Sequence, residues 1–281
     1  MTFICYAQNF EDIVLWRVFR LSVEKGFYID VGANDPTTHS VTKAFYDRGW
    51  RGINVEPSPN FFERLCAERL RDINLQVAVS DREGQLTFFD EGGGLSTVDQ
   101  KVAADLRRDG SQVVEYSVPS QTLNSICERY IDGEIHFLKI DVEGHETSVL
   151  RGMDFERWRP WVLLIESPFN VEPEWRPLLE SARYHEVRRD GINRFFLAEE
   201  HMALKGAFDM PPGFLDDFQF CWGHHFSYPI AELQSQLACE RERANAAEAQ
   251  LVALVSDPWL RLKPLSKLRK KILRKLTARD S

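Results

Sequence analysis

The sequence is poor in cysteine, in long hydrophobic runs and in positive charge. No apolar stretch approaches bilayer-spanning length, and the N-terminus lacks the basic region of a signal peptide. The net charge of -8 argues against nucleic acid as the main partner. The five cysteines are Cys5, Cys66, Cys127, Cys221 and Cys239. Because they are scattered and odd in number, neither a metal site nor a disulfide framework is indicated, and we expect a reduced, cytoplasmic protein.

The chain also lacks the Gly-x-Gly-x-x-Gly turn that favours a pyrophosphate. Instead, residues 26–35 read as a buried strand that runs into Gly32, Asn34 and Asp35. Gly32 lets the backbone approach a ligand closely, and Asp30 places a carboxylate at the carboxyl end of the strand. Such a turn suits a cationic nucleoside without phosphate, as S-adenosylmethionine (SAM) is. The alternative is an ordinary Asn-Asp-Pro turn after a buried strand.

Two further strand ends carry candidate cofactor contacts. Glu56 ends the second predicted strand, some twenty residues past the glycine turn, where an acidic residue suits a ribose hydroxyl. Its alternative role is a capping or exposed turn carboxylate, and we favour the ribose. Ser80 and Asp81 end the third predicted strand, where they could bind an adenine edge or simply begin a turn.

The 281 residues alternate between strand-like and helix-like segments, which predicts an α/β sandwich with a mostly parallel sheet. Segments 184–188 and 193–197 could form a closing antiparallel hairpin. The predicted strands before it are 27–31, 52–56, 75–81, 86–89, 113–118, 135–141 and 161–166. The predicted helices are 7–21, 40–48, 60–69, 123–130 and 175–183. Between them, 92–97 reads as a flexible loop that either reaches the substrate or only links two strands.

A second polar cluster follows the strand at 135–141. Asp141, Glu143 and His145 lie there, with Glu166 at the end of the neighbouring strand. In a doubly wound sheet these ends share the edge that holds the ligand. His145 is the candidate general base because its ordinary pKa lies near working pH, and Asp141 could orient the acceptor or take its proton. Glu143 and Glu166 are candidate substrate contacts.

The same groups could instead bind a divalent cation that lowers the pKa of a hydroxyl acceptor. Asp141, Glu143, His145 and Glu166 are the candidate ligands. Nothing in their spacing requires a metal, so the metal stays unknown at this point.

These motifs together resemble the FkbM family of SAM-dependent methyltransferases. The matching stretches are AQNFED at 7–12, FYIDVGAN at 27–34, NVEP at 54–57 and LKIDVEGHE at 138–146. The resemblance implies the class I methyltransferase fold, which is Rossmann-like, with SAM near Asp30, Gly32 and Asn34, ribose at Glu56 and the acceptor near Asp141. It also implies methylation of hydroxyls, on sugars or on polyketide-type natural products, by enzymes that differ in their use of a metal. The segment at 8–12 resembles the family's entry helix, which suggests a lid.

The last part of the chain differs in character, so we divide it into a methyltransferase domain, 1–228, and a helical tail, 229–281. Apolar residues follow a heptad from Ile230 to Leu254, as in a short coiled coil that could pair two copies or pack on its own domain. Segment 259–279 is basic and amphipathic, which suits peripheral contact with an anionic inner membrane face. A solvated tail or an acidic protein partner is the alternative.

We therefore predict a SAM-dependent O-methyltransferase acting on a sugar hydroxyl of a surface glycan or its precursor. Three alternatives remain: methylation of a polyketide-type product, a nicotinamide-dependent oxidoreductase on a similar sheet, and a non-catalytic assembly subunit. Asp35 and the absent third glycine argue against the oxidoreductase, because a pyrophosphate would meet negative charge. The carboxylate and histidine cluster argues against the assembly subunit.

Overall fold

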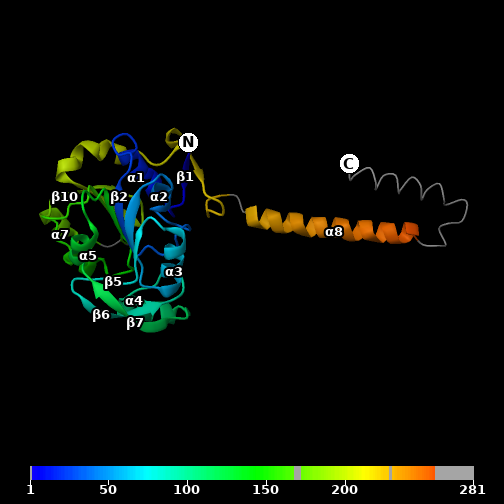
Figure 1. The fold of residues 1–281 in the computed structure, drawn as a ribbon, viewed down its shortest axis with the longest axis horizontal. Helices are drawn as coiled ribbons and strands as arrows, with labels where there is room; N and C mark the ends of the chain where they lie inside the picture. The colour runs from blue at the N-terminus through cyan, green and yellow to red at the C-terminus, as the bar shows by residue number, and fades with distance from the viewer. Residues whose placement is uncertain (1, 168–171, 228–229, 257–281) are drawn as a thin grey trace, which may run out of the picture. The chain divides into compact units, whose positions relative to one another are not determined.

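A computed structural model describes residues 2–167, 172–227 and 230–256. The chain divides into two units, Met1–His224 and His225–Ser281, which we describe separately. The first unit, in which Figure 1 labels β2 and β10, is built on a seven-stranded sheet. Its strand order is β10-β11-β9-β8-β2-β3-β4. The predicted α/β class is confirmed, with a mostly parallel sheet and an antiparallel hairpin at its end.

The five parallel strands run side by side from β4 to β9. They are β4 (Ile73–Leu75), β3 (Arg51–Val55), β2 (Phe27–Val31), β8 (Phe137–Ile140) and β9 (Val162–Glu166). The hairpin of β10 (Tyr184–Arg189) and β11 (Asn193–Ala198) pairs antiparallel with β9. Because β2, β8 and β9 lie at the centre, the turns that follow them meet at one edge of the sheet.

Both faces of the sheet are buried, because alternate strand residues point to opposite sides. On one face, Ile29 and Leu138 pack against α5 (Leu123–Tyr130), α6 (Glu146–Arg151) and α7 (Arg176–Ser181). On the other, Tyr28 and Phe137 pack against α1 (Glu11–Phe19) and α2 (Lys43–Asp47). The remaining early helix, α3 (Pro59–Glu68), buries Phe61 and Leu65.

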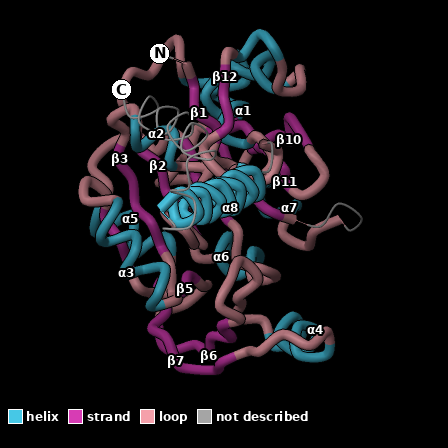
Figure 2. The backbone as a smooth tube through the Cα atoms, turned by 90° about the vertical axis from the view of Figure 1, so that its right-hand side faces the viewer, coloured by secondary structure: helices cyan, strands magenta, loops and turns pink. Residues whose placement is uncertain are grey.

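A second, three-stranded sheet projects from this unit. It contains β5 (Ala78–Val79), β7 (Val114–Gln121) and β6 (Gly84–Asp90), with α4 (Gln100–Arg108) beside it. Figures 1 and 2 both place β6, β7 and α4 at the end of the unit opposite β1 (Phe3–Cys5). The sequence analysis did not predict α4, whose apolar stripe is short: it consists of Val102, Ala103 and Leu106, of which only Ala103 is buried.

The small sheet corrects the prediction of one strand over residues 75–81. The chain forms β4, leaves the main sheet after Leu75, and forms β5 against β7 instead. The Asn54 side chain donates to Asn74 Oδ1 at 2.9 Å and fixes β4 beside β3, whereas Ser80 N–H donates to Gln121 O at 2.9 Å. The mainly apolar segment 75–81 gives no sign that the chain changes its pairing partner, because hydrophobic periodicity does not indicate which sheet a strand joins.

Short elements complete the first unit. β1 pairs with β12 (Phe218–Phe220), and two 3-10 helices follow the hairpin, η1 (Glu199–Phe208) and η2 (Phe214–Asp216). In the second unit, α8 (Ile230–Ser256) covers the predicted heptad segment. The basic amphipathic segment predicted at 259–279 lies outside the described residues. Among the helices described, none has both the length and the apolar character to cross a membrane.

Candidate active site

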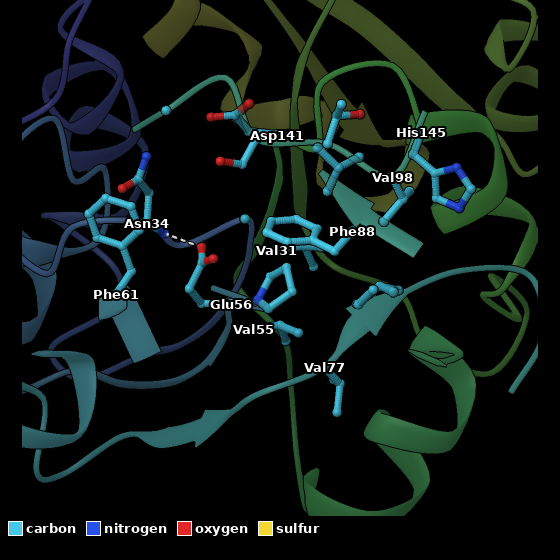
Figure 3. A pocket seen from close by; sticks show the side chains of 18 of the residues that line it. Val31, Asn34, Val55, Glu56, Phe61, Val77, Phe88, Val98, Asp141 and His145 are labelled. Carbon is cyan, nitrogen blue, oxygen red and sulfur yellow. Dashed lines mark hydrogen bonds between the residues drawn. The ribbon is translucent and has the colours of Figure 1, made fainter. Parts of the chain in front are cut away.

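An apolar pocket, here called the first pocket, lies at the carboxyl ends of β2, β3 and β8 (Figure 3). Its lining includes Val31 of β2, Val55 of β3 and Phe88 of β6. The polar residues in the wall include Asn34, Glu56, Asp141 and His145. The structure therefore brings Gly32, Asn34, Glu56, Asp141 and His145, all predicted from sequence, around one cavity. Among the described residues, no Lys or Arg lines this pocket.

Gly32 locks the two central turns together. Its φ is +76°, and a Cβ built there would lie 1.8 Å from the Asp141 carbonyl oxygen. Lys139 Nζ donates to Gly32 O at 2.7 Å, and Asp141 N–H donates to Val31 O at 3.0 Å. Only glycine fits where the β2 turn passes this close to the β8 turn.

Glu56 is a fixed, buried carboxylate in the first pocket. Its Oε2 accepts from Asn34 N–H (Figure 3) and its Oε1 from Ser58 N–H, both at 2.8 Å. Burial raises the pKa of Glu56 to about 7, although these two donors oppose the shift. A carboxylate has more acceptor sites than two backbone donors fill, so Glu56 can also accept from a ligand's hydroxyls.

A second pocket adjoins the first and has a more acidic lining. Asn34, Phe61, Gly94 and Asp141 line both. Six carboxylates line the second pocket: Glu11, Asp30, Asp35, Asp141, Glu143 and Glu166. We infer that a chemical group transferred from a ligand in one pocket to a ligand in the other would pass beside these four shared residues.

Lys139 neutralises part of this charge. Its Nζ lies 3.3 Å from Asp30 Oδ1 and 3.2 Å from Asp141 Oδ2. Burial disfavours the charged ammonium, but the neighbouring Asp141, Asp30 and Glu166 outweigh burial and raise the pKa of Lys139. Lys139 is therefore a permanent cation whose charge is used within the protein.

Asp141, Glu143 and Glu166 form a tight cluster, with one oxygen from each within 4.8 Å of the others. Burial, and then the charge of Asp141, raises the pKa of Glu166 to about 8 and that of Glu143 to about 7. Such a cluster can share a proton or hold a cation.

Three predicted residues lie differently from the expectation. Asp30 lines the second pocket rather than the first, and its Oδ2 accepts from Thr42 Oγ1 at 2.9 Å. Neither Ser80 nor Asp81 lines the first pocket; the Asp81 side chain is exposed, and Ser80 Oγ lies 3.1 Å from His145 Nε2.

His145 lines the first pocket but not the second, across the cavity from Asn34 (Figure 3). Burial lowers its pKa. Because Glu143 and Glu166 line the other pocket, the role of His145 as the base for the acceptor stays a prediction.

The start of α1 reaches the second pocket, where Gln8 and Glu11 line the wall. Glu11 Oε1 accepts from Asn193 Nδ2 and its Oε2 from Asn9 N–H, both at 2.7 Å. Asp12 instead accepts from Tyr6 N–H at 2.7 Å in the protein interior. The segment thus contributes pocket wall as well as a helix start.

The glycine-rich loop at 92–97 was open to two interpretations, and the structure makes it part of both pockets. Gly94 lines both, and Leu95 lines the second. Asp90 holds the loop, because it accepts from Gly92 N–H at 2.8 Å and Ser96 Oγ at 3.1 Å. Thr97 Oγ1 donates to Glu143 O at 2.8 Å. The glycine content of the loop does not by itself predict these hydrogen bonds.

Comparison with known proteins points to one family. A family model, the methyltransferase FkbM domain, matches residues 30–187. The chain is similar to methyltransferase sdnD of Sordaria araneosa, with 29% identity over 198 residues, covering 58% of this chain and 75% of that protein.

Proposed function

Since the chain belongs to the FkbM methyltransferase family, we propose that it is a SAM-dependent O-methyltransferase whose acceptor is a sugar hydroxyl of a surface glycan or its precursor. The observation that carries the proposal is the pair of adjoining pockets that share Asp141. One suits an adenosine moiety and the other a polyhydroxyl acceptor. A methyl donor and its acceptor need such adjoining sites.

The residues of the first pocket fit SAM. Its apolar wall, with Val77 and Phe88, suits an adenine ring, and the buried carboxylate of Glu56 suits the ribose hydroxyls. The bare backbone at Gly32 leaves no side chain between the strand end and the ligand. The nicotinamide alternative is disfavoured, because no Lys or Arg lines this pocket to meet a pyrophosphate.

The second pocket provides the proton acceptor. When bound, SAM supplies a methyl group on a sulfonium, which the acceptor oxygen attacks as it loses its proton. Asp141 lines both pockets, and its ion pair with Lys139 holds the side chain at the crossing point. Glu166, whose pKa is about 8, lies in the same cluster. We assign proton acceptance to the Asp141–Glu166 pair, because a base works best with a pKa near the working pH.

The carboxylate cluster also suits a divalent cation, so metal use is a separate question about the same site. Lys139 already supplies positive charge beside Asp141. We propose that this ammonium takes the place of a metal. Methyl transfer would then keep its rate after dialysis against EDTA, and recovery of a lost rate by Mg²⁺ alone would contradict the assignment.

The test measures cofactor binding first and methyl transfer second. Calorimetry with SAM and with NAD measures which cofactor the full chain binds, and we expect SAM alone. Labelled SAM is then incubated with extracted glycan, and mass spectrometry locates the added methyl on an oxygen. Absence of SAM binding would refute the cofactor. SAM binding with a methyl on nitrogen or carbon would refute only O-methylation, and SAM binding without transfer would favour a non-catalytic subunit.

A further inference from the structure

In the deprotonated form that proton acceptance requires, the second pocket carries more negative charge than the neighbouring cations neutralise. Lys139 meets Asp30 and Asp141 and donates to Gly32 O, so its charge is already used. His39 is the pocket's other basic residue, and burial lowers its pKa. Neither side chain therefore offers a spare positive charge to an anionic ligand.

Arg64 lies 2.5 Å from Asp35 and neutralises one more carboxylate. Glu11, Glu143 and Glu166 have no ion pair with a Lys or Arg among the described residues. The side chain of Asp30 is only 2% exposed, and its Oδ1 accepts no hydrogen bond apart from its ion pair with Lys139. The pocket wall is therefore acidic even where it is buried.

We propose that the acceptor group in this pocket is an uncharged sugar unit at the non-reducing end of a glycan, with any phosphate held outside. This inference rests on the proposed function. Sugar hydroxyls donate hydrogen bonds to carboxylates, whereas Glu11, Glu143 and Glu166 repel an anion at a pH above about 8, where all three are ionised and Glu166 can accept the proton. In a sugar phosphate the negative charge lies within one ring of every hydroxyl, so no hydroxyl could reach Asp141 without bringing that charge in.

The inference gives the enzyme a place in a reaction sequence. A nucleotide-activated sugar loses its diphosphate when a glycosyl transfer attaches the sugar to a growing chain. Glycosyl transfer is therefore the class of reaction that supplies this substrate, and methylation follows it. The methyl then occupies a hydroxyl that a later glycosyl transfer would otherwise extend.

Matched acceptors test this charge selection. The probes are p-nitrophenyl glycosides of glucose, galactose, mannose and rhamnose, each compared with the 1-phosphate of the same sugar, using labelled SAM and the full chain. We expect kcat/KM for the neutral member to exceed that for its phosphate by at least about tenfold. Equal or faster transfer to the phosphates would overturn the inference while leaving sugar O-methylation intact.

A charge variant separates electrostatics from shape. Leu95 lines the second pocket and is 49% exposed, so Leu95→Lys adds a cation at the rim and Leu95→Met keeps an apolar side chain. We expect Leu95→Lys to reduce the neutral-to-phosphate ratio at least about threefold and Leu95→Met to leave it unchanged. An unchanged ratio in Leu95→Lys would overturn the charge argument. SAM binding without transfer to any probe would overturn the proposed sugar acceptor, and this inference with it.

Discussion

The two pockets lie at the same edge of one sheet yet differ in chemistry. The first is lined mainly by apolar side chains and holds two carboxylates: Glu56, which two backbone donors fix, and the shared Asp141. The second holds six carboxylates and the Lys139 ion pairs. Methyl transfer needs both characters, because a nucleoside is bound by apolar burial and a proton is removed by a base. The comparison indicates that the carboxyl edge of the main sheet sets the position of both candidate pockets. The residues of the connecting turns set the chemistry of each pocket.

The strongest way to break both pockets together is Gly32→Ala. Because the new Cβ would lie 1.8 Å from Asp141 O at a φ of +76°, we expect a loss of about 3 kcal/mol or more in the free energy of unfolding. Urea unfolding measures it, and SAM binding should disappear. Gly110→Ala is the control, since φ there is +95° but no atom lies within 4 Å, and its cost should be about 1–2 kcal/mol. Equal costs would contradict the interlocked turns.

Asp141→Asn should separate chemistry from cofactor binding. The variant keeps the shape of the shared wall but removes the carboxylate beside Lys139. We expect kcat to fall by about 100-fold to 1,000-fold, with a much smaller change in SAM affinity by calorimetry. Asp81→Asn serves as control, because the exposed Asp81 lines neither pocket. A similar loss in both variants would remove Asp141 from the reaction.

Glu56→Gln should affect the first pocket alone. Loss of a charged acceptor costs about 1.5–3 kcal/mol per hydrogen bond, so the Kd of SAM should rise about 10-fold to 150-fold. We expect kcat at saturating SAM to stay within about threefold, because Glu56 does not line the second pocket. Glu63→Gln on the exposed side of α3 should change neither quantity. A large fall in kcat with unchanged Kd would refute the ribose assignment.

The pH profile examines the second pocket. Burial and Asp141 raise the pKa of Glu166 to about 8, so at lower pH its carboxyl is protonated and cannot take the acceptor's proton. We expect kcat to rise with pH, by up to about tenfold per unit, and to level off above about pH 8. Asp141→Asn removes the charge that raises this pKa, so the remaining activity should level off at lower pH. A flat wild-type profile would contradict proton transfer to this pair.

His145→Gln should have the smallest effect and distinguishes the two pockets most finely. Because His145 lines only the first pocket and contacts Ser80, we expect the Kd of SAM to rise about threefold while kcat and the pH profile stay close to wild type. Kinetics at saturating SAM across pH measure this. If kcat instead collapses and the ascending limb disappears, His145 is the base and the role of the Asp141–Glu166 pair is wrong.

Sequence alone located most of the candidate site. Gly32, Asn34, Glu56 and Asp141 stand at the ends of apolar strands, and parallel strands bring their carboxyl ends to one edge. The closing hairpin could also be predicted from the sequence, because two segments rich in strand-forming residues flank a short Asp-Gly turn. These features follow from the local order of residues. The fold class and the sheet edge that carries the candidate site could therefore be predicted from the sequence.

The tertiary structure decided what each side chain does at that edge. It separated His145 from the Glu143–Glu166 cluster, moved the end of the third predicted strand into a second sheet, and drew Glu11 and the loop at 92–97 into the walls. It also brought Lys139 beside both Asp30 and Asp141. Proximity of this kind depends on which strands pair and how turns fold back, and it sets the charge and pKa of each group through burial and neighbours. The sequence by itself therefore determined the sheet edge at which the candidate site residues gather, and the packing of distant turns decided which pocket receives charge.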